Sequence, residues 1–242
     1  MAAALAAAVV FWFNLPSVEP LRHVHPSMTA LMEARAEEAR ENGRAARRNQ
    51  HWVPLASISP WLQMAVVNSE DARFYEHDGV DLTQTRYALR EAVERGKLGR
   101  GASTLTQQLA KNLWLGEERT ILRKLRELVL AWRLEGLGKQ RVLELYLNIA
   151  EWGPGIYGAD AAARVWFGKP ASHLLPEEAA LLAAMLPAPL KRNPLRPSWQ
   201  LKQRAWEVLE LYGAYGQLDP DEMAQAWVRM AARLGRTTVS AR

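Results

Sequence analysis

The feature that most constrains the fold of this 242-residue chain is a succession of segments whose apolar residues recur at helical spacing. A period of about 3.6 residues places such side chains on one face of a helix. We expect helices over residues 60–67, 83–95, 104–115, 120–137, 139–150, 158–166, 176–185, 198–212 and 220–234. Runs of alternating β-branched residues are nearly absent, so the sequence predicts a mostly α-helical fold.

The first fifty residues differ from the rest. Residues 2–13 (AAALAAAVVFWF) contain no polar side chain and end in aromatic residues typical of a membrane–water interface. Twelve helical residues extend only about 18 Å, against a bilayer core of about 30 Å. We therefore interpret residues 1–15 as the end of a transmembrane anchor, with a buried or disordered N-terminal helix as the alternative.

The charge-dense residues 28–48 have little apolar face. They predict a solvated stalk or linker over residues 16–50, or else a basic patch that touches lipid headgroups. One globular domain is expected to follow over residues 51–242.

The composition limits the chemistry. The chain has no cysteine, which excludes disulfides, cysteine-ligated metals and a thiol nucleophile. A net charge of +5 fits an anionic partner, whether nucleic acid, an acidic membrane surface or a phosphorylated substrate. The basic residues alternate with acidic ones, which argues against nucleic acid.

Residues 68–79 (NSEDARFYEHDG) place two adjacent carboxylates, Glu70 and Asp71, after a buried helix. Neighbouring residues on a helix point about 100° apart, so only one of the two is expected to face a cleft. Burial at such a position can shift the pKa of a carboxyl group. Taken alone, the pair is also compatible with an ordinary helix end.

Residues 101–112 (GASTLTQQLAKN) combine a glycine loop with a helix capped by serine or threonine. Free backbone N–H groups and the positive end of a helix favour phosphate. Gln107 and Lys111 are four residues apart and are expected to share a face. The alternative is a capped surface helix without a ligand.

Residues 118–127 (ERTILRKLRE) put Arg119, Arg123 and Glu127 at positions i, i+4 and i+8 of a helix. A row of cations that ends in a carboxylate suits a diphosphate beside a reacting sugar. The alternative is a solvated ion-pair face, worth only a few tenths of a kcal/mol. Three leucines of this segment are expected to hold the helix against the core: Leu122, Leu125 and Leu128.

Together these segments resemble the motifs of the peptidoglycan glycosyltransferases (glycosyltransferase family 51, the lysozyme-like module of bifunctional penicillin-binding proteins). The first three motifs, Glu-Asp-x-x-Phe-x-x-His-x-Gly, Gly-[Gly/Ala]-Ser-Thr-x-[Thr/Ser]-Gln-Gln-x-x-Lys-Asn and Arg-Lys-x-x-Glu, match residues 70–79, 101–112 and 123–127. The fourth matches residues 143–148 and 158–169, and the fifth matches residues 178–189. Residues 146–153 (YLNIAEWG) look like the monofunctional Gram-negative branch.

The resemblance implies a lysozyme-like helical glycosyltransferase domain that polymerises lipid II into β-1,4 glycan strands. Transfer to the 4-hydroxyl of the acceptor GlcNAc would invert the anomeric carbon and release undecaprenyl diphosphate. Glu70 would be the catalytic base, and Glu127 a second catalytic glutamate that assists the leaving diphosphate or holds Mg²⁺ or Mn²⁺ there. Residues expected to bind the diphosphate or the donor sugar are Ser103, Gln107, Lys111, Asn112, Arg119, Arg123 and Lys124.

Three further residues are expected to have structural roles. His77 belongs to the first motif and is expected to orient its loop. Glu144 and Asn148 share a helix face and are expected to be structural hydrogen-bonding groups.

The same resemblance implies a single-pass protein of the bacterial inner membrane with its catalytic domain in the periplasm, acting in cell wall biogenesis and cell shape. Lipid II, the growing glycan strand and the membrane are the expected partners, with cell-wall synthases or divisome proteins as candidates. The chain lacks the Ser-x-x-Lys and Lys-Thr-Gly signatures of penicillin-binding domains, so no transpeptidase activity is expected.

Two other readings stay open. A lysozyme-like lytic muramidase also uses a glutamate, although a hydrolase of neutral glycan does not need the cationic row. A non-catalytic membrane scaffold or a basic nucleic-acid binder is the alternative from a different class.

Overall fold

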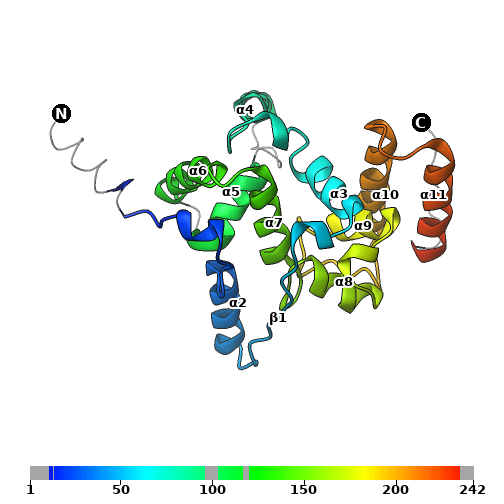
Figure 1. Ribbon diagram of the computed structural model, residues 1–242, viewed down its shortest axis with the longest axis horizontal. Helices are drawn as coiled ribbons and strands as arrows, with labels where there is room; N and C mark the ends of the chain where they lie inside the picture. The colour runs from blue at the N-terminus through cyan, green and yellow to red at the C-terminus, as the bar shows by residue number, and fades with distance from the viewer. Residues whose placement is uncertain (1–10, 13, 96–102, 117–119, 235–242) are drawn as a thin grey trace.

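The computed structural model describes residues 11–12, 14–95, 103–116 and 120–234, and Figure 1 shows that these residues are mostly helical. Each segment predicted to be helical is helical. The helices are α2 (Ala30–Glu41), α3 (Pro60–Glu70), α4 (Leu82–Arg95), α5 (Leu105–Ala110), α6 (Ile121–Glu135), α7 (Lys139–Ile149), α8 (Ala159–Phe167), α9 (Pro176–Ala183), α10 (Trp199–Ala214) and α11 (Pro220–Leu234). A π-helical turn over Lys111–Leu115 continues α5, and short 3₁₀ turns cover Glu19–Arg22, Leu55–Ser57, Phe74–Glu76 and Ala171–His173.

A small sheet joins the N-terminal segment to the helices. Its strands are β1 (Asn49–Gln50), β2 (Glu151–Gly153) and β3 (Ile156–Tyr157), with β3 in the middle, parallel to β1 and antiparallel to β2. Gly158 follows β3 with φ +85°, and a Cβ there would lie 2.7 Å from the backbone oxygen of Asn148. Only glycine fits this turn without displacing α7.

The core is centred on α7 and α9. Helix α9 (PEEAALLA) is apolar on all sides apart from two glutamates, and all of its residues are buried between α3, α10 and α11. Its glutamates are paired with α11: Arg229 Nε lies 2.9 Å from Glu177 Oε1, and Arg233 Nη2 lies 2.8 Å from Glu178 Oε1. These pairs explain how two carboxylates are tolerated in the core.

The polar residues of α7 have structural roles, as predicted. The side chain of Asn148 accepts a hydrogen bond from Val53 N at 3.0 Å and donates one to Val53 O at 2.9 Å. Glu144 Oε2 accepts a hydrogen bond from Leu55 N at 3.0 Å. Both side chains thus fix the extended segment that precedes α3.

The segment predicted to be a solvated stalk is packed in part against the domain. Leu31 and Met32 of α2 are buried against Tyr157 of β3, and Leu21 belongs to the main core. Few apolar residues are needed for this contact, because Leu31 and Met32 lie together near the start of the helix and its other residues are only partly buried or exposed. Low average amphipathicity therefore did not indicate full solvation.

The predicted anchor over residues 1–15 falls largely outside the described residues, which omit residues 1–10 and 13. Within the described ranges, none of the helices combines the length and the apolar character that crossing a membrane requires.

The buried face of helix α6 is not the one that the sequence predicted. Its buried residues are Glu127, Leu130, Ala131 and Leu134. The prediction that Leu122 and Leu125 pack in the core is wrong, since each is 49% exposed, and Leu128 is half-buried. The inward face has the same helical spacing as the leucine face, so periodicity alone did not distinguish them.

Candidate active site

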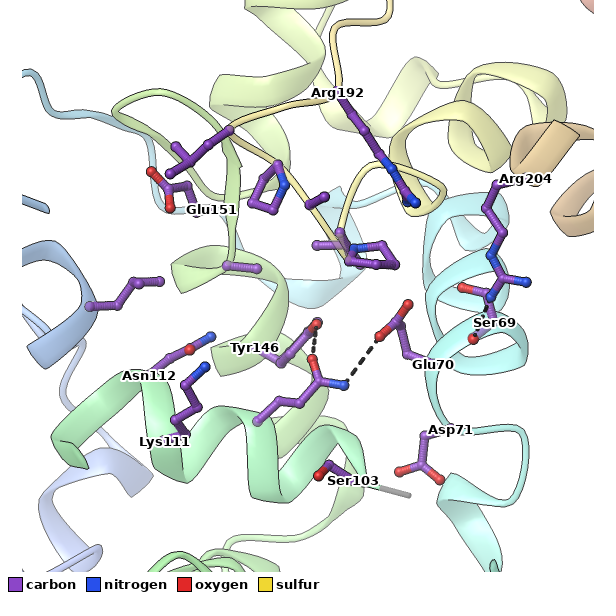
Figure 2. Close-up of a pocket in the computed structure, with 18 of the residues that line it drawn as sticks. Ser69, Glu70, Asp71, Ser103, Lys111, Asn112, Tyr146, Glu151, Arg192 and Arg204 are labelled. Atoms are coloured by element: carbon purple, nitrogen blue, oxygen red, sulfur yellow. Dashed lines mark hydrogen bonds between the residues drawn. The ribbon is translucent and has the colours of Figure 1, made fainter. Parts of the chain in front are cut away.

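One cleft of about 1300 Å³ opens between α3, the α5 and π-helical segment, the end of α7, and the chain that follows α9. Figure 2 shows Glu70 pointing into this space from the last turn of α3, with Lys111 and Asn112 on the opposite helix. Of the residues predicted to form the site, Glu70, Ser103, Lys111 and Asn112 line the cleft. Arg119 lies outside the described residues.

A short hydrogen-bonded chain orients the Glu70 carboxylate. Gln108 Nε2 donates to Glu70 Oε2 at 3.2 Å, and the hydroxyl of Tyr146 donates to Gln108 Oε1 at 2.9 Å (Figure 2). Burial raises the pKa of the Tyr146 hydroxyl well above its ordinary value, so this group stays protonated and acts as a donor. The hydrogen bond from Tyr146 therefore orients the Gln108 amide so that its NH₂ group, and not its oxygen, points to the Glu70 carboxylate.

Burial also raises the pKa of the Glu70 carboxyl above its ordinary value. The hydrogen bond from Gln108 opposes this rise, as do the positive charges of Arg204 and Arg192, whereas the Asp71 charge adds to it. A carboxylate with a raised pKa is a better proton acceptor than an exposed one. Glu70 is thus suited to act as a general base.

Asp71, the neighbour of Glu70, forms structural contacts instead. Its Oδ2 accepts a hydrogen bond from Leu105 N at 2.9 Å, and its Oδ1 lies 3.0 Å from His77 Nε2. These contacts tie the loop after α3 to the first residue of α5, in agreement with the expected orienting role of His77. Asp71 nevertheless lines the cleft together with Glu70, so the prediction that only one of the pair faces it is wrong, and the two carboxylates differ in their contacts instead.

Gly79 completes this junction between the first and second motifs. Thr104 Oγ1 donates to Gly79 O at 2.6 Å. A Cβ at Gly79, which has φ +83°, would lie 2.8 Å from the backbone oxygen of Ala131 in α6. The loop thus packs directly on the backbone of α6.

Two of the amides at the start of α5 that were expected to favour phosphate already have acceptors, and residues 101–102 of the glycine loop lie outside the described residues. Leu105 N donates to Asp71, and Gln107 N donates to the Thr104 hydroxyl at 3.2 Å. Gln107 Oε1 in turn accepts from Thr104 N at 2.9 Å, which completes a capping box. Gln107 is therefore buried in the cap and does not line the cleft.

Gln108 is one of the cleft residues that the sequence reasoning missed. The pattern Thr104-Leu-Thr-Gln107 has the spacing of a capping box, and this signal could have assigned Gln107 to the cap. The neighbouring glutamine would then have been the candidate for the cleft.

Glu127 lies beside the cleft but not in its lining. Its Oε2 accepts from Arg123 Nη1 at 2.6 Å, and its Oε1 is paired with the Lys124 ammonium group. Lys124 Nζ also donates to the Oγ of Ser103 at 3.3 Å, and Ser103 does line the cleft. Arg123 and Lys124, two of the predicted cations, therefore lie behind the residues that line the cleft, and Lys124 is linked to the lining through Ser103.

Two further cations, Arg192 and Arg204, line the cleft near Glu70 (Figure 2). Arg204 Nη2 donates to Ser69 O at 3.1 Å, and Arg192 donates to the backbone oxygen of Ala184. Both residues follow α9, more than one hundred residues after Glu70. No local pattern in the sequence predicted this proximity.

The described donors do not fit a protein-held Mg²⁺ or Mn²⁺ ion. Both oxygens of Glu127, the predicted metal ligand, already accept hydrogen bonds from cations, which compete with a metal ion for the carboxylate. Within the described ranges, no group of three or more metal-binding side chains is found. A Mg²⁺ or Mn²⁺ ion shared between Glu127 and the substrate diphosphate stays a prediction.

Comparison with known proteins adds to this geometry. A family model described as "Transglycosylase" matches residues 36–212. Three relatives named biosynthetic peptidoglycan transglycosylase illustrate the similarity. The protein of Nitrosomonas eutropha is 41% identical over 208 residues, which cover 85% of this chain and 85% of the relative. The protein of Alcanivorax borkumensis is 46% identical over 202 residues (83% and 79%), and that of Rhodospirillum centenum is 51% identical over 158 residues (65% and 68%).

Proposed function

The chain belongs to the transglycosylase family, and from this premise we propose that it polymerises lipid II with Glu70 as the catalytic base. It is a peptidoglycan glycosyltransferase, and lipid II and glycan strands are its substrates. The single observation that carries the assignment of the base is the Glu70 carboxylate, which faces the cleft with a pKa raised by burial.

In the proposed reaction, Glu70 accepts the proton of the acceptor 4-hydroxyl as the oxygen attacks the anomeric carbon of the donor. The bond from that carbon to the diphosphate breaks on the opposite face, so the configuration inverts and no covalent glycosyl-enzyme forms. The Gln108 hydrogen bond holds the carboxylate in place during the attack. A base positioned in this way contributes roughly 10²–10⁴-fold to the rate.

The departing diphosphate requires positive charge, and Lys111 lines the cleft for this role beside Asn112. Lys124 reaches the Ser103 edge of the cleft, and Arg123 supports the same group. In this proposal Glu127 acts by holding Arg123 and Lys124 in position. Fixed donors aimed at a developing negative charge are worth several kcal/mol in a water-poor site, about 2.7–4 for one oxyanion-hole donor.

The chemistry of the cleft favours transfer over hydrolysis. A lytic muramidase acts on glycan that carries no diphosphate. This cleft instead places Lys111, Arg192 and Arg204 around the space that Glu70 faces. Such a surplus of cations suits an anionic lipid-linked substrate.

We also propose that the protein is anchored in the bacterial inner membrane, with the catalytic domain in the periplasm. The outward face of α6 supports this placement, because Ile121, Leu122, Leu125 and Trp132 are all exposed there. Trp12, from the end of the predicted anchor, lies near it, with 6.1 Å between the ring centroids of Trp12 and Trp132. Exposed apolar residues beside an aromatic pair are typical of a membrane-facing surface.

The test is polymerisation of lipid II by the full chain and by Glu70→Gln. We expect the variant to lose activity by roughly 10²–10⁴-fold, the contribution of a general base. Its melting temperature should not fall, because the amide has the same shape and replaces a carboxylate whose charge is disfavoured by burial. Glu76→Gln is the matched control, since Glu76 lies in the same motif but is exposed and paired with Arg73.

Normal polymerisation by Glu70→Gln would refute the assignment of the base. Cleavage of preformed glycan by the unmodified protein, with no polymer formed from lipid II, would establish the muramidase alternative.

A further inference from the structure

The cleft continues beyond the groups that surround Glu70. Its far wall is formed by Leu31 and Arg35 of α2 and by Glu151 of β2. In Figure 2, Glu151 lies on the same side of the cleft as Lys111 and Asn112, across from Glu70. A helix that precedes all of the catalytic motifs therefore forms part of the site.

Arg35 is held in this wall by ion pairs. Its Nε donates to Glu151 Oε2 at 3.0 Å, and its Nη1 donates to Glu38 Oε2 at 3.2 Å. The Glu151 side chain is almost fully buried, whereas that of Arg35 is 21% exposed. Behind Arg35, Leu31 and Met32 pack against Tyr157. The guanidinium group is thus fixed in position while its side chain still borders the cleft.

The groups on this wall suit a sugar. The planar Arg35 guanidinium carries N–H donors that suit the hydroxyls of a sugar ring, whereas Leu31 is nearly buried and contributes only a small apolar edge to this wall. The volume of the cleft, about 1300 Å³, exceeds the ~300–1,000 Å³ that is typical of pockets for one small ligand. The cleft therefore has room for sugar units beyond those that react.

We propose that Arg35 binds a saccharide unit of the peptidoglycan substrate that is remote from the reacting bond. Helix α2 is then a substrate-positioning element and not only a connector to the anchor. The inference rests on the proposed function, because it needs a substrate with more than one sugar unit. The unit belongs either to the growing strand or to the lipid-linked acceptor, and kinetics distinguish the two.

The experiment compares the full-chain protein with Arg35→Ala, Arg35→Lys and Arg40→Ala. Arg40 is the matched control, because it lies on the same helix in an exposed ion pair with Glu37, 2.8 Å between Nη2 and Oε2. KM and kcat are measured separately for the first coupling of two lipid II molecules and for extension of a lipid-linked oligosaccharide. The melting temperature of each variant is recorded, and Glu70→Gln is assayed in parallel.

Arg35→Ala is expected to raise KM about tenfold with little change in kcat, the factor that corresponds to losing one charge-assisted hydrogen bond to the substrate. A rise confined to extension assigns the unit to the growing strand, and a rise in both assays assigns it to the acceptor. Arg35→Lys keeps the charge but not the planar fork and should show a smaller rise. Arg40→Ala should behave like the unmodified protein.

An unchanged KM for Arg35→Ala in both assays would overturn the inference. A fall in kcat and melting temperature without a change in KM would do the same, because it would show a merely structural role. If Arg35→Ala does not fold, Arg35→Lys decides, and an unmodified KM in that variant counts against the proposal.

Failure of the proposed function has a different signature. In that case the unmodified protein makes no polymer and Glu70→Gln is indistinguishable from it, which also removes the basis of this inference.

Discussion

The hydrogen bond from Gln108 to Glu70 leads to a quantitative prediction for Gln108→Leu. In the folded protein, burial raises the pKa of the Glu70 carboxyl, and the Gln108 amide lowers it by stabilising the ionised form. Leucine removes the donor and keeps a side chain of similar size. We therefore expect the pKa of Glu70 to rise further in the variant.

The size of the effect follows from the geometry. Hydrogen bonds to charged groups contribute ~1.5–3 kcal/mol, and a donor–acceptor distance of 3.2 Å is at the long end of the N–H···O range. We therefore use the lower limit, which corresponds to about a tenfold change in the ionisation equilibrium. Because the base must be ionised, kcat/KM should fall about tenfold at a pH on the rising acid limb, and the limb should move to higher pH. On the plateau at higher pH, where Glu70 is ionised in both proteins, the loss should be much smaller.

The assay is the pH dependence of kcat/KM for lipid II polymerisation, with Tyr146→Phe as a second variant. Removing the Tyr146 hydroxyl leaves the Gln108 amide in place but unoriented, so the limb should move in the same direction by less. A limb that stays in place while the plateau falls would refute the reasoning, since Gln108 would then act on the substrate and not on the base. A limb that moves to lower pH would contradict the sign of the electrostatic argument.

Three further predictions concern the junction, the membrane-facing surface and the metal. Asp71→Ala should lower the free energy of unfolding by ~1–3 kcal/mol in chemical denaturation, because the Leu105 N–H is left buried without its acceptor. Leu122→Ser combined with Leu125→Ser should weaken co-sedimentation with anionic vesicles about thirtyfold, since half-exposed leucines still offer ~1 kcal/mol each for burial in lipid, whereas Val228→Ser on α11 should have no effect. Calorimetric titration of Mg²⁺ into the protein without substrate should show no binding, because the carboxylate predicted to hold the ion is already paired with two cations. Equal vesicle binding by all variants, or a saturable Mg²⁺ isotherm, would contradict the corresponding argument.

Local patterns in the sequence determined the helices and the position of the base. The predicted segment 220–234 coincides with α11, and the segment 120–137 contains α6, because periodicity and capping act over a few neighbouring residues. The placement of Glu70 at the end of a buried helix was also evident from the run of apolar residues before it. The sequence therefore predicted the positions of residues whose surroundings are determined mainly by their own helix.

Tertiary packing alone decided the rest. Helix α6 has two faces with apolar spacing, and the face carrying Leu130 and Leu134 is buried because α5 and the Gly79 loop pack there. Arg204 lies near Glu70 because α10 packs against α3. Arg35 borders the cleft because α2 packs against the π-helical turn and because Arg35 pairs with Glu151, 116 residues away. Such contacts depend on the relative placement of segments that are far apart in the sequence, and local sequence patterns do not predict that placement.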